Sequence, residues 1–232
     1  MALAPMRIGG MSFDFSRPYI VGILNVTPDS FSDGGAFLDA PRALDRALAM
    51  VEEGADIIDV GGESTRPGSR PVDADEEKRR VVPVIAMMRR STEIPISVDT
   101  TKAEVAEAAL AEGANMINDV SCLRFDPGLA AVAARASVPI VLMHSRKTPS
   151  DMQEDIRYDD LFGDVLAELK ASMAEAVRLG VDESGIIVDP GIGFAKTVEH
   201  NLQVLANLGF LARLGRPVMV GPSRKSFIGK LT

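Results

Sequence analysis

A chain of 232 residues is long enough for one α/β barrel domain or for two small domains. Apolar residues make up 46% of it, enough for a sizeable core, and the net charge of −8 argues against the basic face of a general nucleic-acid-binding protein. No apolar run approaches the roughly 18–20 residues of a membrane span, and no secretory signal is visible. Together with the single cysteine, these features indicate a cytoplasmic protein without an intrachain disulfide.

Short apolar runs typical of strands alternate with helical repeats along the chain. Residues 7–15 alternate apolar and polar side chains about a Gly-Gly pair, which predicts a β-hairpin lying as a lid on the bottom of a barrel. The strand-like runs that follow cover residues 19–24, 56–60, 94–98, 115–120, 139–143, 185–188 and 217–220. Between them, helices are expected to begin near residues 41, 73, 101, 126, 161 and 197.

Several helices carry specific local predictions. Asp73 with Glu76, and Thr101 with Glu104, have the spacing of a capping box at a helix start. Pro83, inside the second helix, predicts a kink or a break. In the last complete helix, leucines that are expected to face the core recur at residues 202, 205, 208, 211 and 214.

Seven strand–helix units, the last one cut short at Thr232, fit an α/β fold of the TIM (β/α)8 barrel type, which has eight parallel strands and about 250 residues. We therefore expect residues 1–232 to form a single barrel domain with an N-terminal β-hairpin. The eighth strand and the last helix are expected to be absent from the chain, which makes the domain C-terminally incomplete. An open or domain-swapped barrel is the alternative.

Acidic or amide side chains stand at the ends of four strand-like runs. They are Asp59, Asp99, Asn118 and Asp189. In a barrel of alternating strands and helices, every strand's C-terminal end opens on one common face, where active sites lie. One such Asp would more often cap the following helix, but several on one face favour a functional pocket.

Four loops on that face are rich in glycine, hydroxyl and charged side chains, and they cover residues 25–35, 61–69, 189–196 and 221–226. The first can supply oxygen ligands for a hydrated Mg²⁺ and backbone N–H groups for a phosphate, although an ordinary turn-rich connection has the same composition. Arg66, Arg224 and Lys225 would face the same mouth. A positive cluster on an acidic protein suits an anionic substrate.

These loops closely resemble those of the dihydropteroate synthase family. The most specific segments run from Asn25 to Gly35 and from Gly61 to Gly68, and the shorter matches Ser97 to Thr100, Asn118-Asp119, Asp189 to Gly191 and Ser223 to Ser226 follow in family order. The resemblance covers nearly the whole chain and lacks only the family's last strand, with its Arg-x-His segment. It implies a transferase that condenses 6-hydroxymethyl-7,8-dihydropterin diphosphate with 4-aminobenzoate and releases pyrophosphate. It also implies Mg²⁺ as cofactor, a homodimer formed on helices far from the site, and inhibition by sulfonamides.

The resemblance assigns residues to the pterin. The pyrimidine edge of a pterin offers N–H donors to a carboxylate, so Asp189 can accept two of them, as the family does. Asp99 and Asn118 are expected to hold the same ring, and Lys225 its carbonyl and ring-nitrogen side. Met143 would line the floor under the ring, although an ordinary core methionine is an equally good interpretation.

The resemblance also assigns the other substrate groups. Asn25 is expected to contact Mg²⁺ or the diphosphate, and Thr65 the diphosphate. The residues expected to shape the 4-aminobenzoate side are Phe31, Arg66, Pro67, Gly193, Phe194, Ser223 and Arg224. Asn25, Asp99, Asp189 and Lys225 would form the catalytic set, acting by positioning and charge stabilisation without a protein nucleophile.

Two alternative functions remain open from the sequence. A methyltransferase barrel that binds methyltetrahydrofolate would share the Asp and Asn contacts to the pterin but would not need the diphosphate loops. A truncated protein would bind a pterin without turnover. Elsewhere, His144 is expected to be peripheral because a lone histidine matches no metal-ligand set, His200 to lie on the surface, and Cys122 to be a buried thiol.

Overall fold

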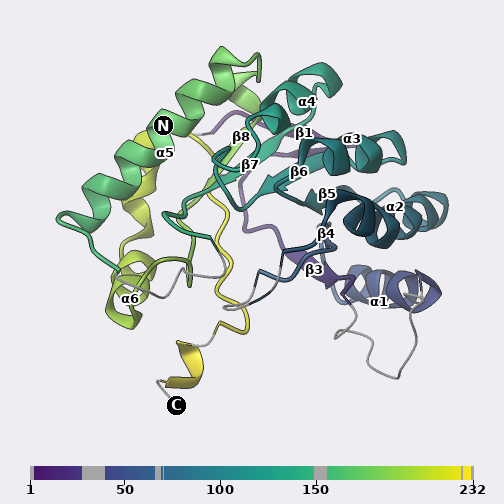
Figure 1. The fold of residues 1–232 in the computed structure, drawn as a ribbon, viewed down its shortest axis with the longest axis horizontal. Helices are drawn as coiled ribbons and strands as arrows, with labels where there is room; N and C mark the ends of the chain where they lie inside the picture. Colours follow the sequence, from purple (N-terminus) through teal and green to yellow (C-terminus); the bar gives the residue numbers. More distant parts are fainter. Residues whose placement is uncertain are drawn as a thin grey trace.

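The computed structural model describes residues 3–27, 40–65, 69, 71–148, 156–225 and 227–230. Six parallel strands lie in chain order in one sheet: β3 (Val21–Asn25), β4 (Ile57–Gly61), β5 (Ile96–Asp99), β6 (Met116–Asp119), β7 (Ile140–Met143) and β8 (Ile186–Asp189). The helices that alternate with them are α1 (Ala40–Glu52), α2 (Ala74–Ser91), α3 (Ala103–Ala111), α4 (Gly128–Ala136), α5 (Leu161–Arg178) and α6 (Val198–Ala206). Figure 1 shows these helices on the outside of the sheet. The predicted fold class, a TIM-type α/β barrel, is confirmed.

The predicted seventh strand, residues 217–220, is much shorter than expected. It makes one parallel bridge, between Val218 and Val188, with a hydrogen bond from the Met219 N–H to the Val188 carbonyl. Within the described residues, the sheet therefore runs from β3 to this bridge, and no strand pairing there joins its two edges.

The two faces of the sheet bury different side chains, because successive residues of a strand point to opposite sides. Residues such as Ile58, Val98 and Leu142 belong to the main core, which also contains the inner faces of the helices. Their neighbours Ile57, Met116, Val141 and Ile187 belong to a second, smaller cluster inside the barrel. The barrel interior is thus apolar near the amino ends of the strands.

The predicted hairpin closes that end. β1 (Met6–Ile8) pairs antiparallel with β2 (Met11–Phe13), and Met6, Ile8 and Phe13 are buried against the inner apolar cluster. The buried residues that the six-stranded sheet contributes to that cluster are each the first or second residue of their strand, so the hairpin lies on the bottom of the barrel as predicted.

Local helix predictions were right in part. Asp73 caps α2 by accepting a hydrogen bond from the Glu76 N–H, and α2 continues through Pro83 without a break. The capping box predicted at Thr101 is wrong: Lys102 holds the cap position, and the Asp126 carboxylate of another loop accepts from the Ala103 N–H at 2.7 Å. A cap supplied from a distant segment leaves no local sequence signal.

The predicted leucine-rich helix is also different. α6 ends at Ala206, and a 3₁₀ helix, Leu208–Leu214, follows. Leu202 is exposed, whereas Leu211 is fully buried. A spacing of three residues matches the 3.0 residues per turn of a 3₁₀ helix better than the 3.6 of an α-helix, which explains the error.

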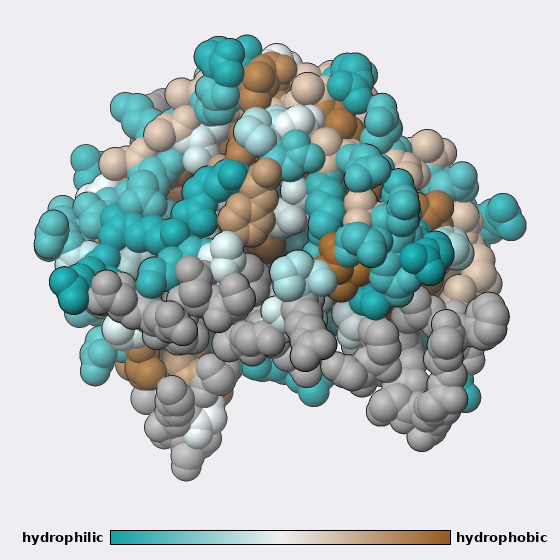
Figure 2. Space-filling view, in the orientation of Figure 1, coloured by the Kyte–Doolittle hydropathy of each residue, from teal (hydrophilic) through white to brown (hydrophobic). Residues whose placement is uncertain are grey.

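The face of the molecule seen in Figure 2 is mainly hydrophilic, with small hydrophobic patches between the charged side chains. In the described part of the chain, no helix is both long and apolar enough to cross a membrane.

Candidate active site

The strand register brings polar residues together at the carboxyl end of the sheet. Asn25 pairs with Gly61, Gly61 with Asp99, and Asp99 with Asn118. Further along the sheet, Asp189 pairs with Met143. The residues predicted to hold the pterin therefore lie on one end of the barrel, at the mouth opposite the hairpin.

Asp59, one of the four polar residues expected at the strand ends, was given no role toward a substrate and lies beneath this row. It is buried, and its carboxylate accepts a hydrogen bond from the Asn118 side-chain amide at 2.9 Å. Burial raises its pKa, and the bond from Asn118 opposes that rise. Asp59 stands two residues before Gly61, so the two-residue period of the strand places it on the same inner face. That period is the signal that could have identified it.

Asp189 is held by the turn that follows β8. The Gly191 N–H donates to its carboxylate at 2.6 Å. Gly191 has a φ of +69°, and a Cβ there would collide with the His144 carbonyl oxygen, so only glycine fits. Burial raises the pKa of Asp189 to about 6, and the Gly191 N–H and the charge of Lys225 oppose the rise.

Lys225 is close enough to Asp99 and Asp189 for its charge to interact with both carboxylates. Burial lowers the pKa of Lys225, and these two carboxylates oppose that change. The pKa of Asp99 is raised well above its usual range, by burial and then by the neighbouring charge of Asp59. The Lys225 ammonium also lies 4.0 Å from the centre of the Phe194 ring, and a Cβ on Gly193 would come within 2.9 Å of the Lys225 side chain. Gly193 thus leaves room for the lysine stem.

An apolar wall stands beside these charges. It consists of Met143 and Phe194, both buried, with the partly buried Val120 packed against them. This cluster is separate from the main core and from the cluster under the hairpin. A polar pocket with one apolar wall suits a flat heteroaromatic ring whose edge carries hydrogen-bonding groups.

A cavity of about 520 Å³ opens over the loops that follow β4 to β8. Three predicted site residues line it: Thr65, Asp99 and Phe194. Lys102 and Lys147 contribute cations to its wall. The cavity thus extends from Thr65, in the loop predicted to hold the diphosphate, to Asp99 at the barrel mouth.

The remaining predicted residues lie further out. Asn25 is exposed at the end of β3, and Ser223 and Arg224 are exposed just before Lys225. Arg224 has a left-handed backbone, with φ at +56°. Phe31, Arg66 and Pro67, all predicted for the 4-aminobenzoate side, lie outside the described residues.

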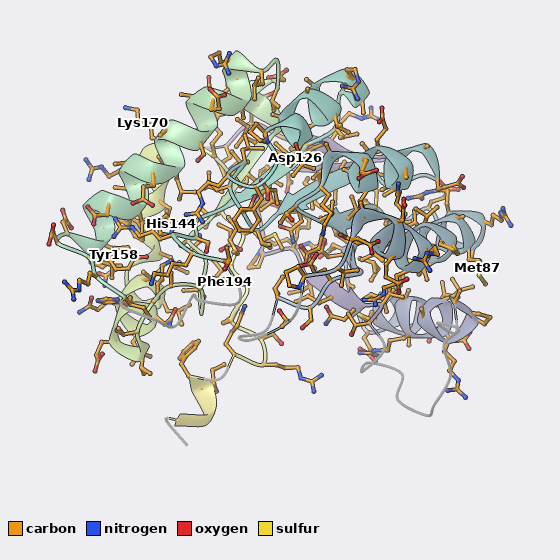
Figure 3. All side chains as sticks on the ribbon, viewed as in Figure 1. Met87, Asp126, His144, Tyr158, Lys170 and Phe194 are labelled. Carbon is orange, nitrogen blue, oxygen red and sulfur yellow. The ribbon has the colours of Figure 1, made fainter. Side chains whose placement is uncertain are left out.

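His144, for which a peripheral role was expected, is buried, with 1% of its surface exposed. Figure 3 shows it with Tyr158 and Phe194 on the side of the molecule where α5 approaches the barrel mouth. His200, expected on the surface, is half-buried and completes a capping box with Thr197 at the start of α6. Cys122 is a buried free thiol, as predicted.

The residues present fit a weakly held Mg²⁺. No group of three or more His, Cys, Asp or Glu side chains in the described residues could hold a metal ion by itself. Asn25 presents one neutral amide oxygen beside the barrel mouth. Mg²⁺ commonly takes only one or two protein ligands and completes its shell with water and substrate phosphates, so the donor set suits an ion that arrives with a diphosphate.

The fold and site indicate an enzyme for a small anionic, ring-containing substrate, and comparison with known proteins identifies the class. The family described as pterin binding enzyme matches residues 21–232. Dihydropteroate synthase from Synechocystis sp. is 51% identical over 228 residues, covering 98% of this chain and 79% of that protein. The chain belongs to the dihydropteroate synthase family.

Solved structures agree with this placement. The dihydropteroate synthase of Xanthomonas albilineans with 4-aminobenzoic acid matches with a TM-score of 0.90 and 45% identity, over 98% of this chain and 81% of that one. The Yersinia pestis enzyme in a sulfonamide drug complex matches with a TM-score of 0.92 and 42% identity, over 98% and 82%.

Proposed function

We propose that this chain condenses 6-hydroxymethyl-7,8-dihydropterin diphosphate with 4-aminobenzoate to give 7,8-dihydropteroate and pyrophosphate in folate biosynthesis. Family membership supports the reaction. The structural observation that carries it is the alignment of Asp99, Asn118 and Asp189 at one end of the barrel, where the charge of Lys225 interacts with both carboxylates. The methyltransferase alternative finds no support among the relatives described above, which are dihydropteroate synthases.

The pterin would occupy the inner pocket. Asp189 would accept two N–H bonds from the pyrimidine edge, and Asp99 and Asn118 would bond the rest of the ring. Lys225 would donate to the carbonyl and ring-nitrogen side, and Met143 would lie under the ring. Because Asn118 is itself held by Asp59, its orientation is fixed before the ligand arrives, which reduces the entropy cost of binding.

The diphosphate would lie at the outer rim. Asn25 and Thr65 would hold it, the first through Mg²⁺ or directly. When bound, Mg²⁺ would neutralise the charge that develops on the diphosphate oxygens. Thr65 lines the cavity next to Asp99, and Asn25 lies across Gly61 from Asp99, so both are within the same mouth.

The 4-aminobenzoate would bind between the loops above the pterin. The residues proposed for this part are Phe31, Arg66, Pro67, Gly193, Phe194, Ser223 and Arg224. The aromatic ring of Phe194, next to Lys225, would support the benzoate ring. A sulfonamide, which carries the same aniline group, should compete with 4-aminobenzoate in steady-state inhibition assays.

The chemistry needs no protein nucleophile. The bond between the pterin methylene carbon and the diphosphate oxygen breaks first, and its electron pair leaves with the diphosphate. The pterin ring stabilises the resulting cation, the amine nitrogen of 4-aminobenzoate attacks the carbon, and the nitrogen then loses a proton. The catalytic set of Asn25, Asp99, Asp189 and Lys225 acts by holding the two substrates in line and by stabilising charge in a site that excludes water.

A product assay tests the proposal. Incubation with the pterin diphosphate, 4-aminobenzoate and Mg²⁺ should release pyrophosphate and form dihydropteroate in equal amounts, and omission of 4-aminobenzoate should abolish dihydropteroate formation. Pterin binding by calorimetry without any release of pyrophosphate would identify a protein that binds without turnover and would overturn the proposed reaction.

Homodimer formation and a cytoplasmic location are further proposals. They rest on the family resemblance alone. Sedimentation equilibrium would test the dimer.

A further inference from the structure

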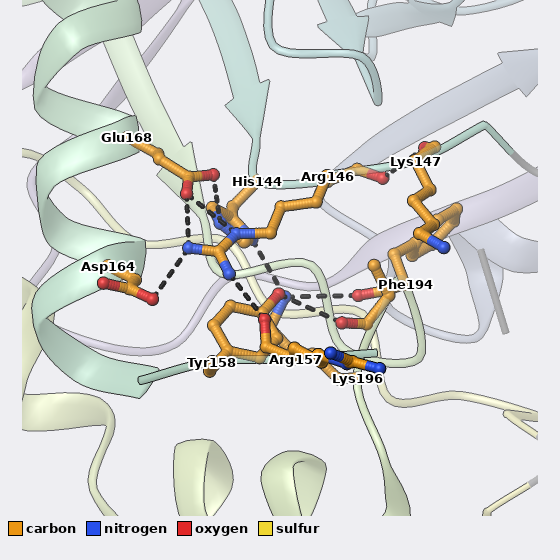
Figure 4. A network of polar contacts seen from close by, with 11 residues as sticks. His144, Arg146, Lys147, Arg157, Tyr158, Asp164, Glu168, Phe194 and Lys196 are labelled. Atoms are coloured by element: carbon orange, nitrogen blue, oxygen red, sulfur yellow. Dashed lines mark hydrogen bonds and ion pairs between the residues drawn. The ribbon is translucent and has the colours of Figure 1, made fainter. Parts of the chain in front are cut away.

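Three buried or half-buried titratable side chains form a hydrogen-bonded series behind the barrel mouth. The reaction described above does not use them. The Lys196 ammonium is 3.0 Å from Nδ1 of His144, and Nε2 of His144 is 3.0 Å from the Glu168 carboxylate. Lys196 is 2% exposed and His144 1%. Figure 4 shows that this series connects α5 to the end of β7 and to the loop after β8.

The hydrogen bonds run in one direction. A protonated lysine has no acceptor, so Nδ1 of His144 accepts while Lys196 is charged. Nε2 therefore carries the proton and donates to Glu168. Burial lowers the pKa of His144 to about 4, which keeps the ring neutral in this tautomer. Glu168 is held in turn by Arg146, whose Nε donates to it at 2.8 Å.

The hydrogen-bonded series ends at the backbone carbonyl of Phe194. The Lys196 ammonium also donates to the Phe194 carbonyl at 3.3 Å. Ala195 of that loop has a φ of +46°, which is unfavourable for a residue with a Cβ, so contacts beyond its own backbone preference hold it there. The Phe194 N–H donates to the Gly191 carbonyl within the loop, and the Lys196 ammonium is the side-chain donor to the Phe194 carbonyl.

Apolar packing would be a simpler way to fill the space. A buried ammonium loses its hydration, and burial lowers the pKa of Lys196 to about 7. Neutral amine and ammonium both have N–H groups for the Phe194 carbonyl. The useful property of lysine here is therefore directed hydrogen bonding rather than charge.

We propose that Lys196, held by His144 and Glu168, is a positioning residue that keeps the Phe194 ring against Lys225 and so forms the 4-aminobenzoate part of the site. This inference rests on the proposed function. Asp189 depends less on Lys196, because it lies in the β8 ladder and its carbonyl accepts from the His144 N–H at 2.8 Å. Loss of Lys196 should therefore affect 4-aminobenzoate more than the pterin.

Kinetics of Lys196→Met at pH 8 test this difference. The KM for 4-aminobenzoate should rise roughly tenfold or more, since misplacement of a positioning contact by about 1 Å can cost up to about a hundredfold. The Kd of the pterin diphosphate, measured by calorimetry, should stay within about threefold. Equal losses for both substrates, or an unchanged KM, would overturn the proposal.

Tyr158→Phe is the matched control. It removes a hydrogen bond of 3.0 Å from the Tyr158 hydroxyl to the carbonyl of Ala195, in the same loop and one residue away. The proposal expects the KM for 4-aminobenzoate to change by less than about threefold in this variant. If Tyr158→Phe raised it as much as Lys196→Met, general docking of the loop would explain both effects, and the specific role of Lys196 would be wrong.

A measurement without substrates separates this inference from the proposed function. The chain contains no tryptophan, so Phe194→Trp introduces a single fluorescent reporter at a site that is 5% exposed. Adding Lys196→Met should shift the emission to longer wavelength and raise quenching by iodide at least about twofold, while adding Tyr158→Phe should not. Unchanged quenching would overturn the proposal even in a fully active enzyme. Should the methionine variant not fold, Lys196→Leu provides the same comparison.

Discussion

Among single residues, Asp189 should dominate pterin binding. It is buried at the end of β8, and one of its oxygens already accepts from Gly191. Asp189→Ala would leave the pterin N–H groups without acceptors in a buried pocket, and we expect a loss of roughly 2–5 kcal/mol in binding free energy. Calorimetry with the pterin diphosphate at pH 8 measures it. A Kd within about threefold of the original would contradict the assignment.

The same carboxylate should also set part of the pH dependence of stability. Its pKa is about 6 in the folded protein against 3.8 for an ordinary Asp, a difference worth roughly 3 kcal/mol. The folded state holds the proton more tightly, so this stabilisation is complete below pH 3.8 and is lost as the pH rises through about 6.

Urea unfolding of Asp189→Asn and of the original protein would check the sign. Asn does not titrate, so the variant should gain stability relative to the original as the pH rises from about 4 to about 7. Taking the difference between the two proteins removes the contributions of other titrating groups, including Asp59, Asp99 and His144. A constant difference across this range would show that the pKa of Asp189 is not raised.

The sequence could predict many of these positions, and the reason is physical. Asp99, Asn118 and Asp189 end their strands, and parallel strands present their ends on one face. The supporting roles of Lys196 and Asp59 were not predicted, because nothing local shows that this lysine folds back into the core or that this carboxylate holds an amide of another strand. Such roles depend on which residues meet across the barrel.

At the scale of a loop and its helix, Lys102 holds the segment after β4. Its ammonium bonds Glu63 of that loop at 2.5 Å and Glu77 of α2 at 2.6 Å. The Glu77 side chain is fully buried. Lys102→Met would leave that carboxylate unpaired, and we expect the free energy of unfolding to fall by roughly 3–5 kcal/mol.

Lys78→Met is the control for this prediction. Lys78 bonds Asp75 and Glu104, but both of these partners are exposed, so the expected loss is below about 1 kcal/mol. Adding Glu77→Gln to Lys102→Met should recover part of the larger loss, because the buried charge is then gone. Equal losses for the Lys102 and Lys78 variants in urea unfolding would show that the buried pair has no special role.

Helix boundaries show where prediction from local pattern fails. α3 receives its cap from Asp126 and not from Thr101, and the leucine series after α6 forms a 3₁₀ helix. In both cases tertiary contacts override the local signal. The existence and order of the helices and of the first six predicted strands, in contrast, follow from hydrophobic periodicity, which reflects burial along the whole element.

Across the whole molecule, structural support and chemistry lie at opposite ends of one sheet. The hairpin fills the amino end with apolar side chains, and the carboxyl end carries the polar row and Lys225. A continuous apolar strand sequence does not reveal which of its residues point inward, so this division could be predicted only where a polar residue or a glycine marked the inner face.

This separation predicts that stability and ligand binding can be changed independently. Phe13 of the hairpin is 2% exposed and packs edge-to-face on Tyr19, with 4.8 Å between the ring centres. Phe13→Ala should lower the free energy of unfolding by roughly 3–5 kcal/mol, as for other large buried side chains. The Kd for the pterin diphosphate, measured well below the unfolding temperature, should stay within about threefold because the carboxyl end of the sheet keeps its register.

Met11→Ala, on the same hairpin but 44% exposed, is the control and should change neither quantity appreciably. A large loss of pterin affinity in Phe13→Ala would show that the hairpin and the site are coupled through the barrel interior.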